Sequence, residues 1–290
     1  MTADAATIPL PRRLAALVRI EHTVFALPFA YVGALLSVDA WPGLASMVWI
    51  TVAMVGARTL AMSLNRLVDA EIDARNPRTA NRELPAGTLT RPQVALLCGL
   101  ALGVFLLAVF QLDPVVRWLW PIPVVLFVVY PYLKRVTWLC HVWLGACLGL
   151  APVGAWLAVT GTAPWEAWAI GGAVLMWVAG FDLFYSLFDV DHDRVEGLHS
   201  WAVRFGERGV FRGARLFHTG AVVLLAAAGL GLDVSLFYWL GVVVTAALLV
   251  HEHRLVRPGD LRRLDAAFFT MNGVISVVFF VFVALDVLVA

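Results

Sequence analysis

The chain has 290 residues, 61% of them hydrophobic, and a mean hydropathy of +0.85. These values exclude an ordinary soluble enzyme and place the protein in the membrane class. A formal net charge of +1 gives no sign of a nucleic-acid partner, and the three cysteines lie in apolar runs without the spacing of a disulfide framework or a metal site.

Apolar segments of roughly 17–25 residues, the length that crosses a bilayer, recur along the whole chain. The basic N-terminal segment runs into the first of them without a small-residue cleavage site, so we expect a first spanning helix and no removed signal peptide. The pattern predicts an all-α, polytopic membrane protein with about nine transmembrane helices. The predicted spans are 22–38, 44–69, 93–111, 114–132, 138–160, 165–189, 213–231, 234–250 and 267–288.

The connectors between these spans alternate in charge. Four short connectors carry turn-forming residues and no Lys or Arg, whereas the alternate connectors are basic. By the positive-inside rule, the N-terminus and the basic connectors of a multi-pass cell-membrane protein lie in the cytoplasm, and nine spans leave the C-terminus outside. The basic connectors are 70–92, 133–135, 190–212 and 251–265.

One basic connector begins inside a charged stretch, "NRLVDAEIDARNPRTANRELPAG", at residues 65–87. Asn65, Asp69 and Asp73 recur every four residues, so they line one face of a helix. Carboxylates packed this closely repel each other, and a divalent metal ion is the plainest compensation.

A second acidic cluster, "FDLFYSLFDVDHD", lies at residues 181–193. Asp182, Tyr185, Asp189 and Asp193 share one face of a continued helix. Asp182 lies inside the membrane boundary, where an acid costs roughly 2.5–3.5 kcal/mol and is treated first as a functional residue.

The two clusters also suggest an internal repeat within a single domain of residues 1–290. Asp69 and Asp189 lie 120 residues apart, at the same end of two spans with the same orientation. This relation is expected of a parallel repeat about an axis along the membrane normal. The predicted pseudo-repeats are 22–132 and 138–250, followed by a final helix at 267–288.

Clusters with oxygen ligands alone suit Mg²⁺, which keeps water and adds phosphate oxygens to its shell. Basic side chains nearby would bind phosphate through charge-assisted hydrogen bonds. We therefore expect a cytoplasm-facing pocket for a diphosphate whose lipid tail lies in the bilayer. The basic candidates are Arg58, Arg78, Arg82, Lys134, Arg135 and Arg19. The open alternatives are a bridge between helices for Arg58, charges that only set the topology for Lys134 and Arg135, and an interfacial anchor for Arg19.

The two acidic stretches resemble the aspartate motifs of the UbiA superfamily of intramembrane aromatic prenyltransferases. The likeness includes "EHTVFALPFA", "YPYLKRVTWLCHVWLGACLGLAPVGAW" and "EGLHSWAVRFG", and it is closest to bacterial 4-hydroxybenzoate-type and menaquinone-pathway polyprenyltransferases. The chain departs from the family pattern at Phe188, where Gln is common, and at Trp201 and Ala202, where Ile-Pro is common. None of these three is a proposed metal ligand.

The resemblance implies a helical bundle around a central cavity with two Mg²⁺ ions at its mouth. It also implies transfer of a polyprenyl group from polyprenyl diphosphate to a hydroxylated aromatic acid in menaquinone or ubiquinone biosynthesis. The implied partners are polyprenyl diphosphate, a small aromatic acceptor and the lipid bilayer. The implied catalytic residues are Asp69, Asp73, Lys134, Asp189 and Asp193. The implied metal ligands are Asn65, Asp69, Asp73, Asp182, Asp189 and Asp193. Tyr130 and Tyr185 join the basic candidates named above, Lys134 among them, as the implied diphosphate-binding residues.

Several alternatives stay open at this point. Protohaem farnesyltransferase, chlorophyll-type synthase and prenyl-phosphate ribosyl transfer belong to the same superfamily. A secondary transporter would also have a repeat and intramembrane charges, although its helices would more often be broken near the midplane. The sequence fixes neither the aromatic acceptor, the prenyl chain length, the base that removes the ring proton nor the oligomeric state.

Overall fold

The computed structural model describes residues 9–18, 23–256 and 270–289, and every regular element in these ranges is a helix. Within these ranges, eight helical segments are long and apolar enough to cross a membrane, and α2 is apolar but shorter, so the predicted number of nine is approximate. The prediction of an all-α, multi-pass membrane bundle is confirmed. The short apolar helix is α2 (Thr23–Leu36), and the eight longer segments are α3 (Leu44–Arg75), α4 (Arg91–Val109), α5 (Val116–Leu119) with α6 (Pro121–Leu133), α7 (Cys140–Thr160), α8 (Trp165–Tyr185), α10 (Trp201–Gly231), α11 (Leu236–Leu255) and α12 (Asn272–Val289).

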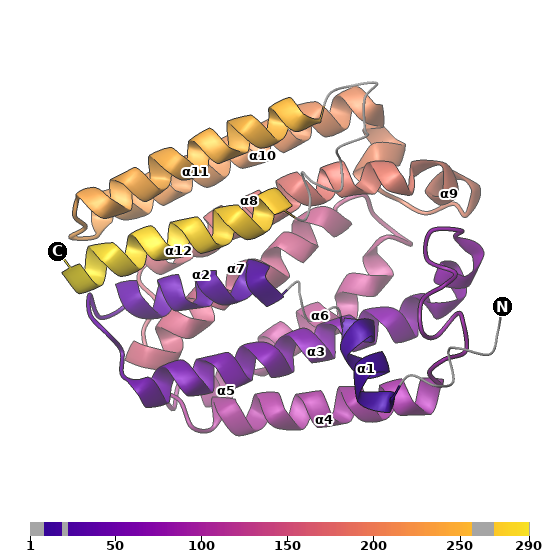
Figure 1. Cartoon of the computed structure of the whole chain (residues 1–290), viewed down its shortest axis with the longest axis horizontal. Coiled ribbons are helices and arrows are strands. Elements are labelled where there is room, and N and C mark those ends of the chain that lie inside the picture. Colours follow the sequence, from indigo (N-terminus) through magenta and orange to yellow (C-terminus); the bar gives the residue numbers. More distant parts are fainter. Residues whose placement is uncertain (1–8, 19–22, 257–269, 290) are drawn as a thin grey trace.

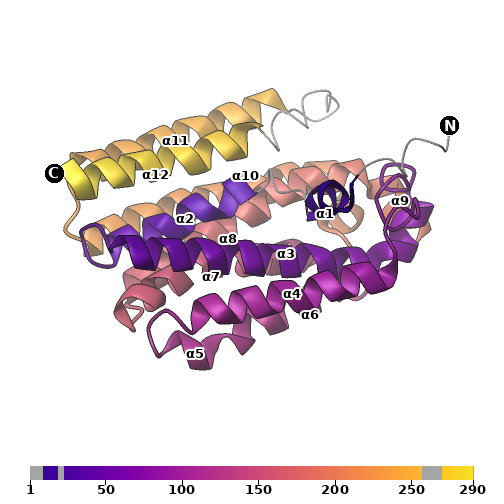
Figure 2. The same cartoon turned by 60° about the horizontal axis from the view of Figure 1, so that its bottom comes forward.

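The remaining helices are short: α1 (Leu10–Val18), the 3-10 turn η3 (Ser186–Phe188) and α9 (Val190–Val195). Figures 1 and 2 show α9 and the loop that follows α3 at one end of the bundle, whereas α12 ends at the opposite end. Both acidic clusters therefore lie at the same end, as predicted. Which side of the membrane this end faces, and the division into two pseudo-repeats, stay predictions.

Two helices extend beyond the lipid-spanning length, and both shape the site. α3 has 32 residues, and at 1.5 Å per residue it is about 48 Å long, so its acidic end projects past a hydrocarbon core of about 30 Å. α10 begins at Trp201, twelve residues before the predicted span, because residues 201–212 form an amphipathic helical stretch rather than a loop. Ser200 caps this helix by accepting a hydrogen bond from the Val203 N–H at 3.3 Å. A kink follows at Gly206, whose φ of +66° suits glycine.

The centre of the bundle is α8. In its most apolar stretch of 18 residues 72% are buried, against 11–39% in the corresponding stretches of the other seven long segments. α7 approaches it closely because glycines face its backbone: a Cβ on Gly145 would lie 2.3 Å from the carbonyl oxygen of Leu175. Small residues allow such close packing between membrane helices. This contact brings His141, at the start of α7, against Asp182, near the end of α8.

Candidate active site

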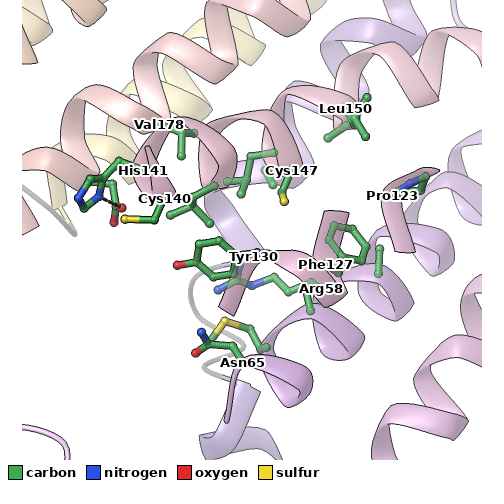
Figure 3. Close-up of a pocket in the computed structure, with 18 of the residues that line it drawn as sticks. Arg58, Asn65, Pro123, Phe127, Tyr130, Cys140, His141, Cys147, Leu150 and Val178 are labelled. Atoms are coloured by element: carbon green, nitrogen blue, oxygen red, sulfur yellow. Dashed lines mark hydrogen bonds and ion pairs between the residues drawn. The ribbon is translucent and has the colours of Figure 1, made fainter. Parts of the chain in front are cut away.

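A cavity of about 600 Å³ lies among α3, α6, α7 and α8, with its polar end at the acidic clusters and an apolar remainder. The expected central cavity is therefore present. Figure 3 shows Arg58 and Asn65, from α3, close to Tyr130 of α6 in its wall. The lining includes all six predicted metal ligands, Asn65, Asp69, Asp73, Asp182, Asp189 and Asp193, and the predicted substrate-binding residues Arg58, Arg78, Arg82, Tyr130, Lys134 and Tyr185.

The first acidic motif lies on the inner face of the last turns of α3. Asp69 and Asp73 are only 3% and 5% exposed. Asp69 accepts a hydrogen bond from the Asn65 amide at 3.1 Å, and its Oδ2 lies 2.7 Å from Nζ of Lys134. Arg82 donates to both carboxylate oxygens of Asp73 at 2.8 Å. Each buried acid thus has a basic partner, as buried charges require.

The second motif does not follow one continuous helix, which corrects the sequence-based expectation. α8 ends at Tyr185, a 3-10 turn follows, and α9 begins at Val190. Asp189, with φ −110° and ψ 3°, forms the junction between the two. The break keeps Tyr185, Asp189 and Asp193 in the wall of the same cavity.

Arg78, in the loop after α3, joins the two motifs. Its Nε donates to Oδ1 of Asp189 at 2.8 Å, its Nη2 pairs with Oδ2, and its Nη1 donates to the Tyr185 hydroxyl at 2.7 Å. Asn76 donates a further hydrogen bond to Asp189 at 2.8 Å. This bidentate geometry is the one that arginine uses for carboxylate and phosphate alike.

The pKa values of two acids in the second motif are shifted in opposite directions. Burial alone would raise the pKa of Asp189, but the hydrogen bonds and charge of Arg78 lower it below its ordinary value. Burial raises the pKa of Asp193, and the nearby charge of Asp189 raises it further. Burial opposes the charge of Arg78, yet its pKa is raised because Asp189 and Tyr185 stabilise the cation. A cation placed between the two acids would remove the repulsion that raises the pKa of Asp193.

Three segments at this end of the bundle form one mouth. Arg75, at the end of α3, pairs with Glu196 after α9 at 2.7 Å. The His199 N–H donates to the Lys134 carbonyl oxygen at 2.6 Å, joining the second motif's loop to the turn after α6. The loops that carry the phosphate-binding candidates are thus tied to one another.

His141, which is not among the site residues expected from the sequence, also lines the cavity. Nδ1 of His141 lies 2.7 Å from Oδ2 of Asp182, and Nε2 accepts the Trp201 N–H at 3.2 Å. Because a backbone N–H can only donate, the proton of the neutral ring sits on Nδ1 and is donated to Asp182. The available signal was a histidine seven residues after Lys134, at the start of a span. This pair holds Asp182 in the cavity wall.

Two predicted substrate contacts differ from the rest. Arg135 lies 3.1 Å from Oδ1 of Asp69 and donates to the backbone carbonyl oxygens of Pro131 and Val68 at 2.6 and 3.0 Å. It braces α6 against α3 and does not line the cavity, so its contact with substrate stays a prediction. Arg19 lies outside the described residues.

The site fits Mg²⁺ together with an anion better than Mg²⁺ alone. Within residues 9–18, 23–256 and 270–289, no three His, Cys, Asp or Glu side chains are grouped closely enough to hold a metal ion by themselves. The donor set nevertheless consists of carboxylate and amide oxygens, and the buried Oδ1 of Asp69 accepts no hydrogen bond despite the nearby Arg135. Mg²⁺ takes one or two carboxylates and completes its shell with water and phosphate oxygens.

Comparison with known proteins agrees with this geometry. Residues 26–274 match the UbiA prenyltransferase family. The 4-hydroxybenzoate octaprenyltransferase of Aromatoleum aromaticum is 31% identical over 245 residues, which cover 84% of this chain and 83% of that protein. The corresponding enzyme of Marinobacter nauticus is 30% identical, covering 82% of this chain and 81% of its own.

Solved structures show the same architecture. The apo structure of a UbiA homolog from Aeropyrum pernix K1 superposes with a TM-score of 0.84 at 31% identity, covering 92% of this chain and 98% of that one. A UbiA homolog from Archaeoglobus fulgidus, bound to DMAPP and Mg²⁺, shares the fold with a TM-score of 0.75 at 17% identity, covering 93% and 97%. This chain belongs to the UbiA prenyltransferase family.

Proposed function

We propose that this protein transfers a polyprenyl group from polyprenyl diphosphate to a hydroxylated aromatic acid, in menaquinone or ubiquinone biosynthesis, with Mg²⁺ bound at the cavity mouth. The observation that carries the proposal is a single cavity with paired carboxylates and cations at one end and apolar walls beyond them. A substrate with a diphosphate head and a hydrocarbon tail has the same division. The names of the relatives from A. aromaticum and M. nauticus support this choice of reaction.

On binding, the diphosphate would replace carboxylates as the partner of three basic side chains. Arg78, Arg82 and Lys134 each neutralise a carboxylate in the structure. With donor bound, these cations would turn to phosphate oxygens, while the freed carboxylates would hold the metal ions. The metal set remains Asn65, Asp69, Asp73, Asp182, Asp189 and Asp193, of which Asp182 keeps one oxygen on His141. The homolog from A. fulgidus was solved with both DMAPP and Mg²⁺, which supports this pairing of ligands.

The proposed chemistry breaks the C–O bond between the allylic carbon and diphosphate, and forms a C–C bond to a ring carbon ortho to a hydroxyl, which then loses its proton. Mg²⁺, when bound, would neutralise charge developing on the leaving diphosphate. Arg78, Arg82 and Lys134 would stabilise the same charge by hydrogen bonds, while Tyr130 and Tyr185 line the cavity beside it. The apolar walls would keep water away from the allylic cation.

The acceptor would lie deeper than the diphosphate. Arg58 precedes Asn65 by seven residues on α3, about 10 Å along the helix axis, and lines the cavity beside apolar residues. A cation at this depth favours an acceptor that carries a carboxylate. We place the mouth of the cavity on the cytoplasmic side of the cell membrane, because the basic connectors 70–92, 133–135 and 190–212 lie at this end (Figure 1).

A membrane assay tests the proposal. Membranes containing the protein receive Mg²⁺, octaprenyl diphosphate and either 4-hydroxybenzoate or 1,4-dihydroxy-6-naphthoate, and both prenylated product and released diphosphate are measured. We expect product with one acceptor and none from Asp69→Asn membranes. Product with 4-hydroxybenzoate would indicate the ubiquinone branch, and product with the naphthoate the menaquinone branch. Absence of product and of diphosphate release with every donor and acceptor would refute the proposed function.

A further inference from the structure

One face of α10 carries three arginines near the end of the bundle that holds the acidic clusters. Arg208, Arg212 and Arg215 follow one another at helical spacing after the kink at Gly206, and all three are exposed. With 100° between successive residues, they lie within a sector of about 60° around the helix axis. Glu207, the acid of this stretch, lies about 140° from Arg212 by the same step. The arginine face is therefore positively charged and carries no acid of its own.

These arginines differ in their partners from other exposed arginines at the same end of the bundle. Arg91 pairs with Glu71 at 2.8 Å, and Arg194 pairs with Asp191 at 3.6 Å. Among the residues that the structure describes, none forms an ion pair or a side-chain hydrogen bond with the three arginines of α10. Like charges one helical turn apart repel each other, and an anion shared between them would relieve the repulsion.

The same face of α10 becomes apolar further along the helix. It continues in three side chains that lie within about 40° of Arg212 by the 100° step. These are Leu216, Val223 and Leu230, with exposed fractions of 68%, 59% and 80%. α10 packs against α8 and α11 on its other sides. Because exposed apolar side chains on a spanning helix face lipid, the arginines adjoin a lipid-facing surface.

The arginines lie where the hydrocarbon core meets the lipid headgroups. Leu230 is next to the far end of α10 at Gly231. The helix rise places Arg215, Arg212 and Arg208 about 23, 27 and 33 Å from Leu230 along the axis. Since the hydrocarbon core is about 30 Å thick, these three side chains span its boundary. Arginine stems can run along apolar surface and keep the charged group at headgroup level.

An aromatic cluster lies at the start of the same helix. The rings of Trp138 and Trp201 are 5.1 Å apart between centroids, and those of Trp201 and Phe205 are 4.8 Å apart. Tryptophan and other aromatic side chains gather at the interface between membrane and water. The cluster therefore agrees with a position of the arginine face at the headgroup layer.

We propose that Arg208, Arg212 and Arg215 bind the phosphate of an anionic phospholipid whose acyl chains lie along Leu216 and Val223. The guanidinium fork suits phosphate oxygens, which accept two parallel hydrogen bonds from it. A headgroup that carries its own cation matches this surplus of positive charge less well, and the cytoplasmic leaflet is the one with a negative surface potential. The site is separate from the proposed catalytic cavity, because none of these five side chains lines that cavity.

Native mass spectrometry of the purified protein in detergent tests the site. The probes are dioleoyl phosphatidylglycerol and dioleoyl phosphatidylcholine, which share their acyl chains. Wild type should bind phosphatidylglycerol at least about tenfold more tightly than phosphatidylcholine, and Arg212→Gln/Arg215→Gln should lose most of this preference. The control Arg91→Gln/Arg194→Gln removes two charges from the same end of the bundle, at arginines that have acidic partners. Its preference should stay within about twofold of wild type.

Three results would overturn the lipid site. Equal affinity of wild type for the two lipids would show that the headgroup is not recognised. A preference that survives in Arg212→Gln/Arg215→Gln, or an equal loss in the control variant, would show that this face is not what selects the lipid. If soluble poly-glutamate bound wild type as tightly as phosphatidylglycerol and lost its binding in Arg212→Gln/Arg215→Gln, the face would fit an acidic protein and the lipid assignment would be wrong.

A photoreactive lipid locates the site in the wild-type protein, without any substitution. Phosphatidylglycerol with a diazirine in one acyl chain should label α10 around Leu216 and Val223. The reference is α4, whose Leu100 and Leu107 are also exposed. We expect the ratio of α10 to α4 labelling to be at least about threefold higher with phosphatidylglycerol than with phosphatidylcholine carrying the same probe. Equal ratios for the two lipids would contradict the proposal.

Discussion

Arg78 binds Asp189, which lies 111 residues further along the chain, through two nitrogen atoms of one guanidinium group. The same side chain donates to Tyr185, so one residue from the loop of the first acidic motif fixes two residues of the second. The two motifs are thereby held at one cavity mouth by the group that would also bind phosphate.

Asp189→Asn should abolish most turnover while its near neighbour Asp191→Asn should not. Asp189 lines the cavity, whereas the side chain of Asp191 is 94% exposed. Removing a preorganised charge at a reacting diphosphate costs about 10²–10³-fold in kcat. Both variants are compared with wild type in the membrane assay at equal expression. Equal activities for the two variants would contradict the assignment of Asp189.

Lys134 offers a chemical test because it is the only lysine in the chain. An amine-acylating reagent can therefore modify only Lys134 and the N-terminal amine. Nζ of Lys134 lies 2.7 Å from Asp69, and its side chain is 28% exposed. We expect geranyl thiolodiphosphate with Mg²⁺ to protect Lys134 from acylation, measured by mass spectrometry with the N-terminus as internal control. Protection of both amines, or of neither, would argue against a diphosphate contact of Lys134.

His141 and Asp182 should behave as one unit in unfolding. Breaking the pair leaves a buried donor or acceptor unsatisfied, which costs about 1–3 kcal/mol in the free energy of unfolding. His141→Ala and Asp182→Asn should each destabilise the protein, and the double variant should lose clearly less than the sum. Thermal unfolding in detergent measures the three variants. Additive losses would show that the 2.7 Å contact contributes no coupling energy.

The Arg78–Asp189 pair should make stability depend on pH on the acid side. The folded-state pKa of Asp189 is lowered, so its contribution is present above the unfolded-state pKa of about 3.9 and is lost as pH falls through the folded-state value. Arg78→Gln removes the group that lowers this pKa. The variant should therefore lose less stability than wild type between about pH 6 and pH 3.

Arg194→Gln is the control for this comparison, because Arg194 pairs at 3.6 Å with the exposed Asp191. It should retain the acid-side loss of wild type when unfolding midpoints are compared at both pH values. An identical loss in all three proteins would contradict the role of Arg78.

The sequence predicted the helices and the acid-bearing motifs because both depend on local signals. Span length and apolar composition locate α3 to α8, and four-residue spacing places Asp69 and Asp73 on one helix face. Helix ends were less predictable. The predicted spans include only continuous apolar residues. The span predicted at 213–231 therefore omits the amphipathic start of α10 at Trp201.

The partners of the polar residues could not be predicted, because they depend on tertiary contacts. The pair between His141 and Asp182 exists because glycines bring α7 and α8 close together. The break after Tyr185 is accompanied by contacts from a distant segment, since Arg78 and Asn76 both donate to Asp189. Arg135 shows the converse: its position in a basic turn suggested phosphate, yet its contacts are with α3 and α6.

The most direct test of the central claim is calorimetric binding of geranyl thiolodiphosphate to purified protein, in Mg²⁺ and in EDTA. Wild type and Glu71→Gln should bind with Mg²⁺ and lose binding in EDTA, since the Glu71 side chain is 75% exposed and pairs with Arg91. Asp69→Asn should not bind under either condition. Equal binding with and without Mg²⁺, or undiminished binding by Asp69→Asn, would contradict a diphosphate site built from the two acidic motifs and Mg²⁺.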